Sequence, residues 1–449
     1  MTASPLAIRG GRVIDPANGL DAVADVLIEG GRIVSVGEGV GKEAREAVDA
    51  AGLIVCPGFV DIHTHLRQPG FEHKETIASG TLAAARGGFT TVCAMPNTEP
   101  AAENAAAIEF VLRTARSEGA VRVLPIGCVS KGRQGKELAE LAELAAAGAV
   151  AFSDDGSPVA DPHLMRRALE YASMLDPSTS LRTGLPVIDH CEDAALAAGG
   201  VMHEGWVAAR LGLRGVPAAA EEAMVARDIA LAELTGSHVH IAHVSTAGAV
   251  DLLRRAKARG LPITAEVTPH HLCLTHEAVL LGAGEAVGGL AYDTNAKVNP
   301  PLRTPEDAAA CLEGLLDGAI DCIATDHAPH AIEDKLCEFD HAAFGISGLE
   351  TAFALCLTLV HDGRLALPSL IERLTAGPVR TLGLDRHVEG IGTLSPGAPA
   401  DVTLLDPAAE WTVEPERFAS KGKNTPLAGR TLRGRVVATL FGGRVVWQA

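Results

Sequence analysis

Apolar and polar positions alternate at both ends of the chain as they do in short β-strands. Glycine-containing pairs such as Gly10-Gly11, Asn18-Gly19 and Gly30-Gly31 separate the first runs and have the composition of turns. The strand-like runs are residues 6–8, 12–14, 25–28 and 32–36 near the start, and 401–405, 411–413, 434–440 and 443–447 near the end. Because the chain between them has a different pattern, we expect the two ends to pair into one small β domain.

The middle of the chain alternates apolar runs of strand length with alanine-rich stretches of helical period. The predicted strands are 53–63, 89–96, 121–129, 149–155, 186–191, 238–244, 262–267 and 320–326, and the predicted helices include 101–117, 137–147, 161–174, 219–235 and 246–259. Eight strands that alternate with helices predict a (β/α)8 barrel. A doubly wound open sheet is the alternative, but no G-x-G-x-x-G follows the first of these strands.

The predicted fold class is therefore α/β, a (β/α)8 TIM-type barrel with a small β-sandwich domain formed by the N- and C-terminal segments. We expect the barrel to span residues 53–390, with 1–52 and 391–449 as the two parts of the β domain. Residues 176–184 are polar and turn-rich and predict a surface loop. Residues 282–299 form a glycine-containing loop whose length suggests a functional role.

Composition and charge narrow the class of protein. A 449-residue chain with 47% hydrophobic and 21% charged residues is typical of a globular protein. The formal net charge of −18, without a basic stripe, argues against nucleic acid and means that an anionic substrate needs local positive charge. Nine cysteines without a C-x-x-C pair predict reduced thiols and no thiolate zinc site. With no secretion signal and no apolar run of membrane length, we expect a soluble cytoplasmic protein.

The stretch from Pro57 to Gly70 carries the first candidate chemistry. Strand alternation places Asp61, His63 and His65 on one face, with Arg67 beyond them on the same side. Two imidazoles on one face can bind a metal ion, but an isolated His-x-His is more often a pair of structural histidines. A metal site therefore requires further ligands elsewhere in the chain.

The carboxyl ends of the other predicted strands supply such ligands, and these ends meet at one mouth of a barrel. They carry Asp154-Asp155, Asp189-His190, His240 with His243, His270-His271, and Asp326-His327. Imidazoles and carboxylates gathered in this way suit a pair of divalent ions, with zinc the first choice. Two such ions about 3.5–4 Å apart can activate a shared water and polarise a substrate carbonyl.

Several of these residues have a structural alternative. Strand alternation turns only one of Asp154 and Asp155 inward, and the sequence does not decide which. His240 reads as a core histidine, and the pair His270-His271 after a proline is as readily structural as functional. Asp326 ends an apolar strand and reads as a functional carboxylate that moves a proton during catalysis. No G-x-S-x-G elbow is present, so covalent catalysis has little support.

A set of local motifs resembles the bacterial type I dihydroorotases of the amidohydrolase superfamily. The motifs are Pro57-Gly58 followed by Asp61, His63, His65, Arg67 and Pro69-Gly70; Met95-Pro96-Asn97; residues 152–156; residues 189–192; residues 243–245; residues 268–271; residues 299–303; residues 326–330; and Phe344-Gly345. The resemblance covers essentially the whole chain. Asp-x-His-x-His marks only the superfamily, whereas Arg67, Asn97 and residues 299–301 make the match specific.

The resemblance implies reversible cyclisation of N-carbamoyl-L-aspartate to L-dihydroorotate in de novo pyrimidine synthesis, with two zinc ions per subunit. It implies that His63, His65 and Asp326 hold one ion, that His190 and His243 hold the other, and that Asp155 bridges them. Asp326 would also be the general base. Many relatives use a carboxylated lysine as the bridge, but the type I pattern uses Asp, so we predict no modified lysine.

The resemblance also implies how the substrate is bound and which partners the chain has. The implied substrate-binding residues are His65, Arg67, Asn97, Asn299, His330, Phe344 and Gly345. Arg67 supplies the planar bidentate cation that an acidic protein needs for an anionic substrate. A homo-oligomer and a complex with aspartate transcarbamoylase are further expectations, whereas nucleic acid and membrane are not expected as partners.

Two alternative functions remain. A hydantoinase or allantoinase would act on a different cyclic amide, but those enzymes usually carry the bridging lysine and lack the context of Arg67. A catalytically silent dihydroorotase-like partner of aspartate transcarbamoylase has typically lost metal ligands, and all six are present in this chain.

Overall fold

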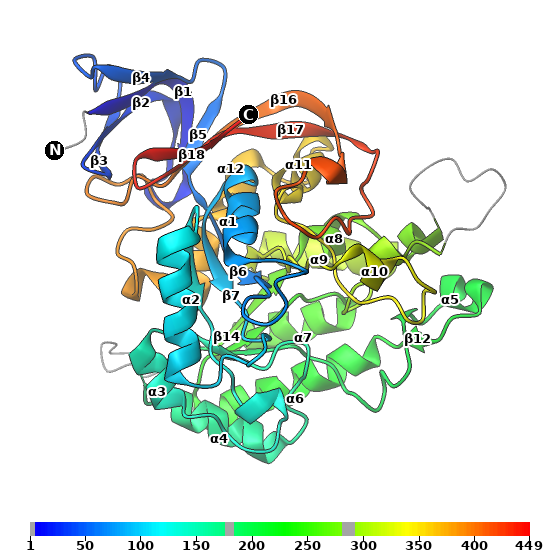
Figure 1. Cartoon of the computed structure of the whole chain (residues 1–449). Helices are drawn as coiled ribbons and strands as arrows, with labels where there is room; N and C mark the ends of the chain where they lie inside the picture. The colour runs from blue at the N-terminus through cyan, green and yellow to red at the C-terminus, as the bar shows by residue number, and fades with distance from the viewer. Residues whose placement is uncertain (1–4, 176–183, 281–291) are drawn as a thin grey trace.

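The computed structural model describes residues 5–175, 184–280 and 292–449, and within them the two ends of the chain share one sheet. Its strands are β1 (Leu6–Asp15), β2 (Leu20–Glu29), β3 (Arg32–Gly37), β4 (Glu46–Asp49), β5 (Ile54–Pro57), β16 (Val402–Thr412), β17 (Thr431–Phe441) and β18 (Arg444–Gln448). The order is β18-β17-β16-β5-β1-β2-β3, with β4 also paired to β1. Figure 1 shows the N-terminal strands in blue beside the C-terminal strands in red.

The second body is a closed barrel of parallel strands. In the described residues its strands are β6 (Phe59–Thr64), β7 (Phe89–Ala94), β8 (Arg122–Pro125), β9 (Phe152–Ser153), β10 (Val187–Asp189), β13 (Val239–Ile241), β14 (Ile263–Val267) and β15 (Cys322–Ile323). Single parallel bridges from Gly127 to Phe152 and from Thr64 to His327 close the two gaps between the strand groups. The predicted α/β barrel with an additional sheet is therefore confirmed.

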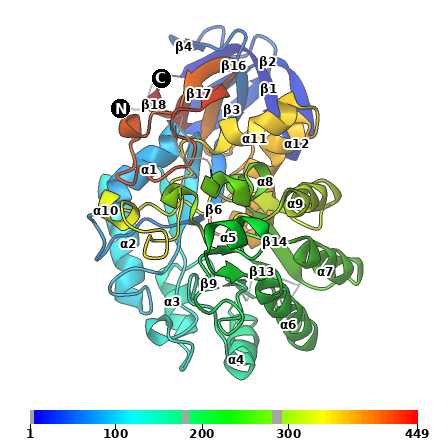
Figure 2. The same cartoon turned by 90° about the vertical axis from the view of Figure 1, so that its right-hand side faces the viewer.

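Helices cover the outside of the barrel, and Figure 2 shows α2, α3, α4, α6, α7 and α9 standing around its strands. The longer helices are α1 (Ile77–Arg86), α2 (Ala105–Glu118), α3 (Leu141–Ala147), α4 (Pro162–Ala172), α6 (Ala219–Thr235), α7 (Ala247–Ala258), α9 (Pro305–Asp317), α11 (Ala352–His361), α12 (Leu367–Leu374) and α13 (Ala376–Leu382). Short elements are α5 (Trp206–Leu211), α8 (Pro269–Cys273), α10 (Ile332–Lys335), β11 (Met202–His203), β12 (Gly215–Val216), and the 3-10 turns Pro16–Asn18, Lys131–Arg133, His276–Leu280, Thr294–Ala296, Leu384–Arg386 and Pro415–Arg417.

Several barrel helices begin at a side chain that caps their first turn. Thr76, Asn104, Thr246 and Thr304 each accept a hydrogen bond from an amide in the first turn of the helix that follows. Because each cap fixes where a helix starts, the connection from the preceding strand end has a defined length. Several of the site residues described below lie on these connections.

The prediction of one strand over residues 53–63 is wrong, because the chain divides at Gly58. β5 pairs with β1 and β16 in the terminal sheet, whereas β6 pairs with β7 in the barrel. Gly58 donates its N–H to the carbonyl of Asp401 at 2.8 Å and lies against Thr90, where a Cβ would overlap the threonine side chain. Both strands are fully buried, so they form one apolar run in the sequence.

Two predicted loops extend beyond the described part of the chain. Most of the predicted insert at 176–184 and of the predicted loop at 282–299 lies outside the described residues, which exclude 176–183 and 281–291. Residues 292–299 are described and contain a 3-10 turn followed by the buried Lys297. Among the described residues, no helix is both long and apolar enough to span a bilayer. The predicted boundaries at 52/53 and 390/391 stay predictions.

Gly58→Ala should destabilise the protein, because the new methyl group must displace Thr90 at the junction of the sheet and the barrel. We expect a loss of about 1–3 kcal/mol, seen as a lower melting temperature. Gly37→Ala in β3 is the matched control, since its Cβ would lie 3.6 Å from Val40, an ordinary contact. Equal melting temperatures for the two variants would show that the junction tolerates a side chain.

Candidate active site

The six predicted ligands converge at the carboxyl end of the barrel. All six are buried, and each lies at the end of a strand or within three residues after it: His63 and His65 at β6, Asp155 after β9, His190 after β10, His243 after β13, and Asp326 after β15. The barrel therefore brings together side chains that lie up to 263 residues apart in sequence. This is the arrangement that the strand-end reading predicted.

The carboxylate of Asp155 lies at the centre of this group, within 3.6 Å of four imidazoles. Its Oδ1 is 3.4 Å from His63 Nε2, 3.5 Å from His243 Nε2 and 3.6 Å from His190 Nδ1, and its Oδ2 is 3.5 Å from His65 Nε2. Burial alone would raise the pKa of Asp155, but the surrounding histidines outweigh it and lower the pKa well below its usual range. The carboxylate is therefore ionised and has imidazole nitrogens on several sides.

The donor atoms fit divalent cations. The ligand atoms of His63, His65 and Asp326 lie within 4.8 Å of one another, as do those of His63, Asp155 and His243. Among the described residues, His63 Nε2 and Asp155 Oδ1 are buried and have no hydrogen-bond partner. Orphaned buried donors and acceptors are rare in folded proteins, and an imidazole nitrogen facing a carboxylate oxygen is a typical pair of zinc ligands.

The structure separates the two adjacent aspartates. Asp154 turns away from the histidines and accepts hydrogen bonds from the amides of Val129 at 2.9 Å and Ser130 at 3.1 Å, and from the Ser130 hydroxyl. Asp154 therefore holds the loop after β8, whereas Asp155 lies among the imidazoles. Arg133 fixes the turn behind them by donating to the Asp155 carbonyl and to Ser157 Oγ.

Glu266 in β14 supports the first histidine, and the sequence analysis missed it. Its Oε1 lies 2.5 Å from His63 Nδ1, and its Oε2 lies 3.2 Å from His240 Nε2. Burial would raise the pKa of Glu266, but the two histidines lower it to about 2. An ionised Glu266 holds the proton of His63 on Nδ1 and leaves Nε2 facing Asp155. The sequence signal that could have indicated Glu266 is its position as a glutamate within a largely apolar strand. His240 is the core histidine that the sequence favoured.

Asp61 ties the first strand of the barrel to the segment after the last one. Its carboxylate accepts hydrogen bonds from the amides of His63 at 3.2 Å and Thr325 at 3.0 Å, and from the Thr325 hydroxyl. Asp61 therefore fixes the backbone at His63 and next to Asp326, because Thr325 directly precedes Asp326. Asp61 itself contributes no atom to the cavity lining.

Three non-glycine residues of the site have left-handed backbone conformations. The φ angles are 61° at Arg67, 33° at His243 and 47° at Asp326. Such conformations are uncommon for residues with a side chain and persist where surrounding contacts fix them. Here the residue after His243 is held firmly, because Val244 donates to the Glu266 carbonyl at 2.9 Å.

The predicted substrate-binding residues line one cavity of about 210 Å³ above the ligands. All seven contribute to its wall, namely His65, Arg67, Asn97, Asn299, His330, Phe344 and Gly345. Two of them also contact ligand imidazoles: Asn97 Oδ1 lies 2.8 Å from His65 Nδ1, and Asn299 Nδ2 lies 3.1 Å from His190 Nε2. Asn97 and Asn299 therefore orient ligands as well as facing the cavity.

Arg67 keeps donor capacity for an anion. Its Nε donates to the carbonyl of Pro329 at 3.2 Å, and its Nη2 lies 3.3 Å from His330 Nε2. That nitrogen of His330 also lies 2.8 Å from the carbonyl of Phe344, and Arg67 Nη1 has no hydrogen-bond partner among the described residues. Burial lowers the pKa of Arg67 to about 10, which leaves it a cation at neutral pH.

Two buried lysines join the loops that carry the far wall of the cavity. Lys335 Nζ donates to the carbonyls of Thr294, Lys297 and Ala343 at 3.0, 3.1 and 2.6 Å. Lys297 Nζ donates to the Phe339 carbonyl at 2.8 Å and lies 4.4 Å from the centre of the Phe344 ring. Residues 292–299 and 335–345 are thus one unit, which we call the lysine-linked wall. No local sequence signal predicted it.

Other histidines near the site are structural. His271 contacts Thr268 Oγ1 at 2.8 Å and the Pro300 carbonyl at 3.0 Å. His327 lies 3.3 Å from the Glu75 carboxylate and accepts from the amide of Gly348 at 3.2 Å. Neither they nor His270 contribute to the cavity lining.

Comparisons with known proteins agree with this geometry. Residues 52–249 match a family described as dihydro-orotase-like. A dihydroorotase from Anaeromyxobacter sp. (strain K) is 56% identical over 443 residues, which is 98% of this chain and 97% of that protein. A dihydroorotase from Pelotomaculum thermopropionicum is 55% identical over 444 residues, with 99% and 98% covered.

Solved structures share the fold. The L-hydantoinase (dihydropyrimidinase) from Arthrobacter aurescens has a TM-score of 0.85 at 25% identity, covering 99% of this chain and 96% of its own. A dihydropyrimidinase from Brevibacillus agri has a TM-score of 0.82 at 23% identity, with 99% and 95% covered.

Glu266→Gln should weaken the binding of divalent metal by about 10- to 100-fold, because the amide no longer fixes the His63 proton on Nδ1. Competition with a chromogenic chelator measures the affinity, and circular dichroism checks the fold. Glu277→Gln, at an exposed position, is the control and should bind as the wild type does. An unchanged affinity in Glu266→Gln would mean that Glu266 serves only the barrel core.

Proposed function

The chain belongs to the dihydroorotase family, and on that premise we propose that its six buried ligands hold two zinc ions at the site of dihydroorotate turnover. The activity is that of a dihydroorotase, a hydrolase of the C–N bond in a cyclic amide, since relatives at 50–56% identity cover nearly the whole chain. The observation that carries the metal proposal is Asp155, an ionised carboxylate among four imidazoles with an unpartnered oxygen.

The proposed division of ligands is the one that the resemblance implies, and the distances are compatible with it. His63, His65 and Asp326 hold the first ion, which is supported by 3.0 Å between His65 Nε2 and Asp326 Oδ1. His190 and His243 hold the second, with their facing nitrogens 2.8 Å apart. Asp155 lies between the two groups. A set of imidazole nitrogens and carboxylate oxygens without thiolates suits zinc.

When bound, a pair of divalent cations supplies Lewis acidity at the substrate carbonyl and lowers the pKa of water. Asp326 then accepts the proton of the attacking water and delivers it to the ring nitrogen as the C–N bond breaks. Burial would raise the pKa of Asp326, but the hydrogen bond from His65 and nearby charges lower it, so the carboxylate is ionised before the reaction. The reverse sequence closes N-carbamoyl-L-aspartate into L-dihydroorotate.

Arg67 distinguishes this substrate from other cyclic amides. Dihydroorotate carries a carboxylate on its ring, whereas hydantoin does not. Arg67 lines the cavity, its Nη1 has no partner among the described residues, and a bidentate pair of a guanidinium with a carboxylate gives affinity and orientation. His330, held by Phe344 at 2.8 Å, closes the side of the cavity beside it.

The cellular setting is proposed on the resemblance alone. Four predictions belong to it. They are a role in de novo pyrimidine synthesis, assembly as a homo-oligomer, a complex with aspartate transcarbamoylase, and a cytoplasmic location.

Asp326→Asn should lower kcat in both directions by about 10²- to 10⁴-fold, because the amide cannot accept the proton. The metal content of the variant is measured alongside, because Asp326 is also a proposed ligand of the first ion. Asp317→Asn, in an exposed ion pair with Arg254, is the control. A near-normal kcat in Asp326→Asn would refute the assignment of the general base.

Arg67→Lys should raise the KM for dihydroorotate by about 10- to 100-fold, because an ammonium cannot reproduce the charge-assisted fork. Arg113→Lys, at an exposed position of α2, is the control. Any slow hydrolysis of hydantoin should be unaffected, since that ring has no carboxylate for Arg67. An equal loss on both substrates would make Arg67 a structural residue.

A further inference from the structure

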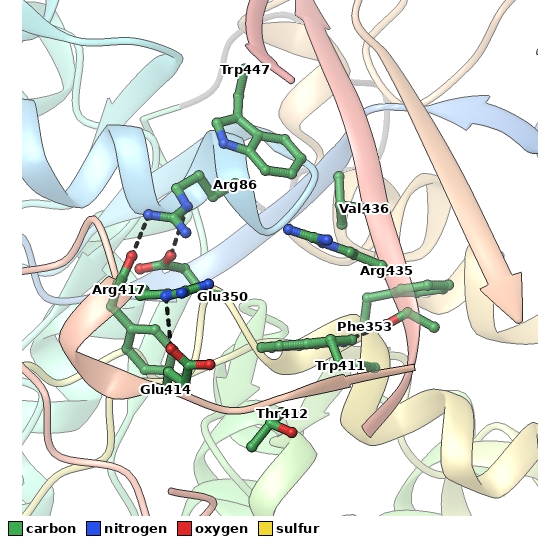
Figure 3. A pocket seen from close by; sticks show the side chains of 13 residues that line it. Arg86, Glu350, Phe353, Trp411, Thr412, Glu414, Arg417, Arg435, Val436 and Trp447 are labelled. Carbon is green, nitrogen blue, oxygen red and sulfur yellow. Dashed lines mark hydrogen bonds and ion pairs between the residues drawn. The ribbon is translucent and has the colours of Figure 1, made fainter. Parts of the chain in front are cut away.

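A second cavity, of about 180 Å³, lies between the terminal sheet and the barrel. Residues of β16, β17, β18, α1 and α11 line it, and none of them lines the catalytic cavity. Figure 3 shows the side chains that surround it. We call it the interface cavity.

Two tryptophans give the interface cavity flat aromatic walls. The whole chain has only three tryptophans, and Trp411 and Trp447 both line this cavity. The indole N–H of Trp411 donates to the Gly434 carbonyl at 2.8 Å, which fixes the plane of its ring. In the described part of the chain, neither indole stacks on another aromatic ring. Both indoles pack in part on apolar core side chains, and the remainder of each ring lines the cavity, where a planar ligand can lie against it.

Of the three arginines in the lining, two are already paired. Arg86 Nε lies 3.0 Å from Glu350 Oε2, and Arg417 Nε lies 2.7 Å from Glu414 Oε2. The side chain of Arg435, an exposed residue of β17, has no hydrogen bond or ion pair with any described residue. Its guanidinium extends into the cavity between Trp411 and Trp447 (Figure 3). The lining therefore has two neutral pairs and one uncompensated cation.

We propose that the interface cavity binds a small planar anion, with its ring against the indoles and its carboxylate or phosphate on Arg435. A guanidinium binds carboxylates and phosphates alike through paired hydrogen bonds. A ligand with one anionic group on an aromatic ring can place that group on Arg435 and its ring against Trp411 and Trp447. The size supports a one-ring ligand, because the catalytic cavity, which takes a single ring with one carboxylate, is only slightly larger at about 210 Å³. This site is separate from the metal ligands and from Arg67.

Nicotinate and phenyl phosphate are suitable probes, one for each anion. Both should quench the tryptophan fluorescence of the metal-loaded full chain in a saturable way, and calorimetry should give one site. The tighter of the two identifies the preferred anion. Nicotinamide, which is neutral, and cyclohexanecarboxylate, which is not aromatic, should bind at least 10-fold more weakly.

Variants locate the binding and separate it from catalysis. Arg435→Gln should weaken the better probe at least 10-fold and leave the hydrolysis of dihydroorotate unchanged. Arg433→Gln, two residues away on β17 and outside the cavity lining, should bind as the wild type does. Arg67→Lys should also leave probe binding unchanged, which excludes the catalytic cavity as the site measured.

Three outcomes would overturn the proposal. The first is the absence of saturable binding by either probe. The second is equal binding of nicotinamide or cyclohexanecarboxylate. The third is unchanged affinity in Arg435→Gln. Because none of these measurements uses turnover, they fail or succeed independently of the proposed dihydroorotase mechanism.

Discussion

The catalytic end of the barrel depends on burying the ionised carboxylate of Asp155. A buried charge is costly unless donors or cations surround it, and here four imidazoles from the strand ends do so. Each imidazole points one nitrogen inward, and in three of the four the other nitrogen has a hydrogen-bond partner. Glu266 and Asn97 are such partners for His63 and His65. The orientation of the ligands is therefore determined by residues outside the ligand set.

The contacts that orient the ligands also close the barrel. Asp61 joins β6 to the segment after β15, and Glu266 joins β14 to both β6 and β13 through histidines. The amide of His65 donates to the carbonyl of His327 at 2.9 Å across the seam between the first and last strands. Loss of one of these groups therefore disturbs the architecture and the site together.

Much of the site could be predicted because a barrel brings every strand end to one mouth. Local pattern gave the alternation of strands and helices and the candidate histidines and carboxylates at the strand ends, whereas the choice of Asp155 over Asp154 and the set of six ligands came from the family resemblance. Three features followed from neither. The division at Gly58 is hidden because two buried strands read as one apolar run. The contact of Glu266 with His63 joins two strands that are far apart in the sequence, so no local pattern indicates it. The lysine-linked wall joins segments that have no common local signal.

The lysine-linked wall carries Asn299, Phe344 and Gly345 but none of the six proposed metal ligands, which lie outside residues 292–299 and 335–345. The wall touches the proposed ligand set through Asn299, whose Nδ2 lies 3.1 Å from His190 Nε2. An exchange of the wall between related enzymes that keeps Asn299 is therefore a change that natural variation or recombination can make while leaving the six proposed ligands in place. Divergence in ring preference within one conserved barrel then has a physical basis.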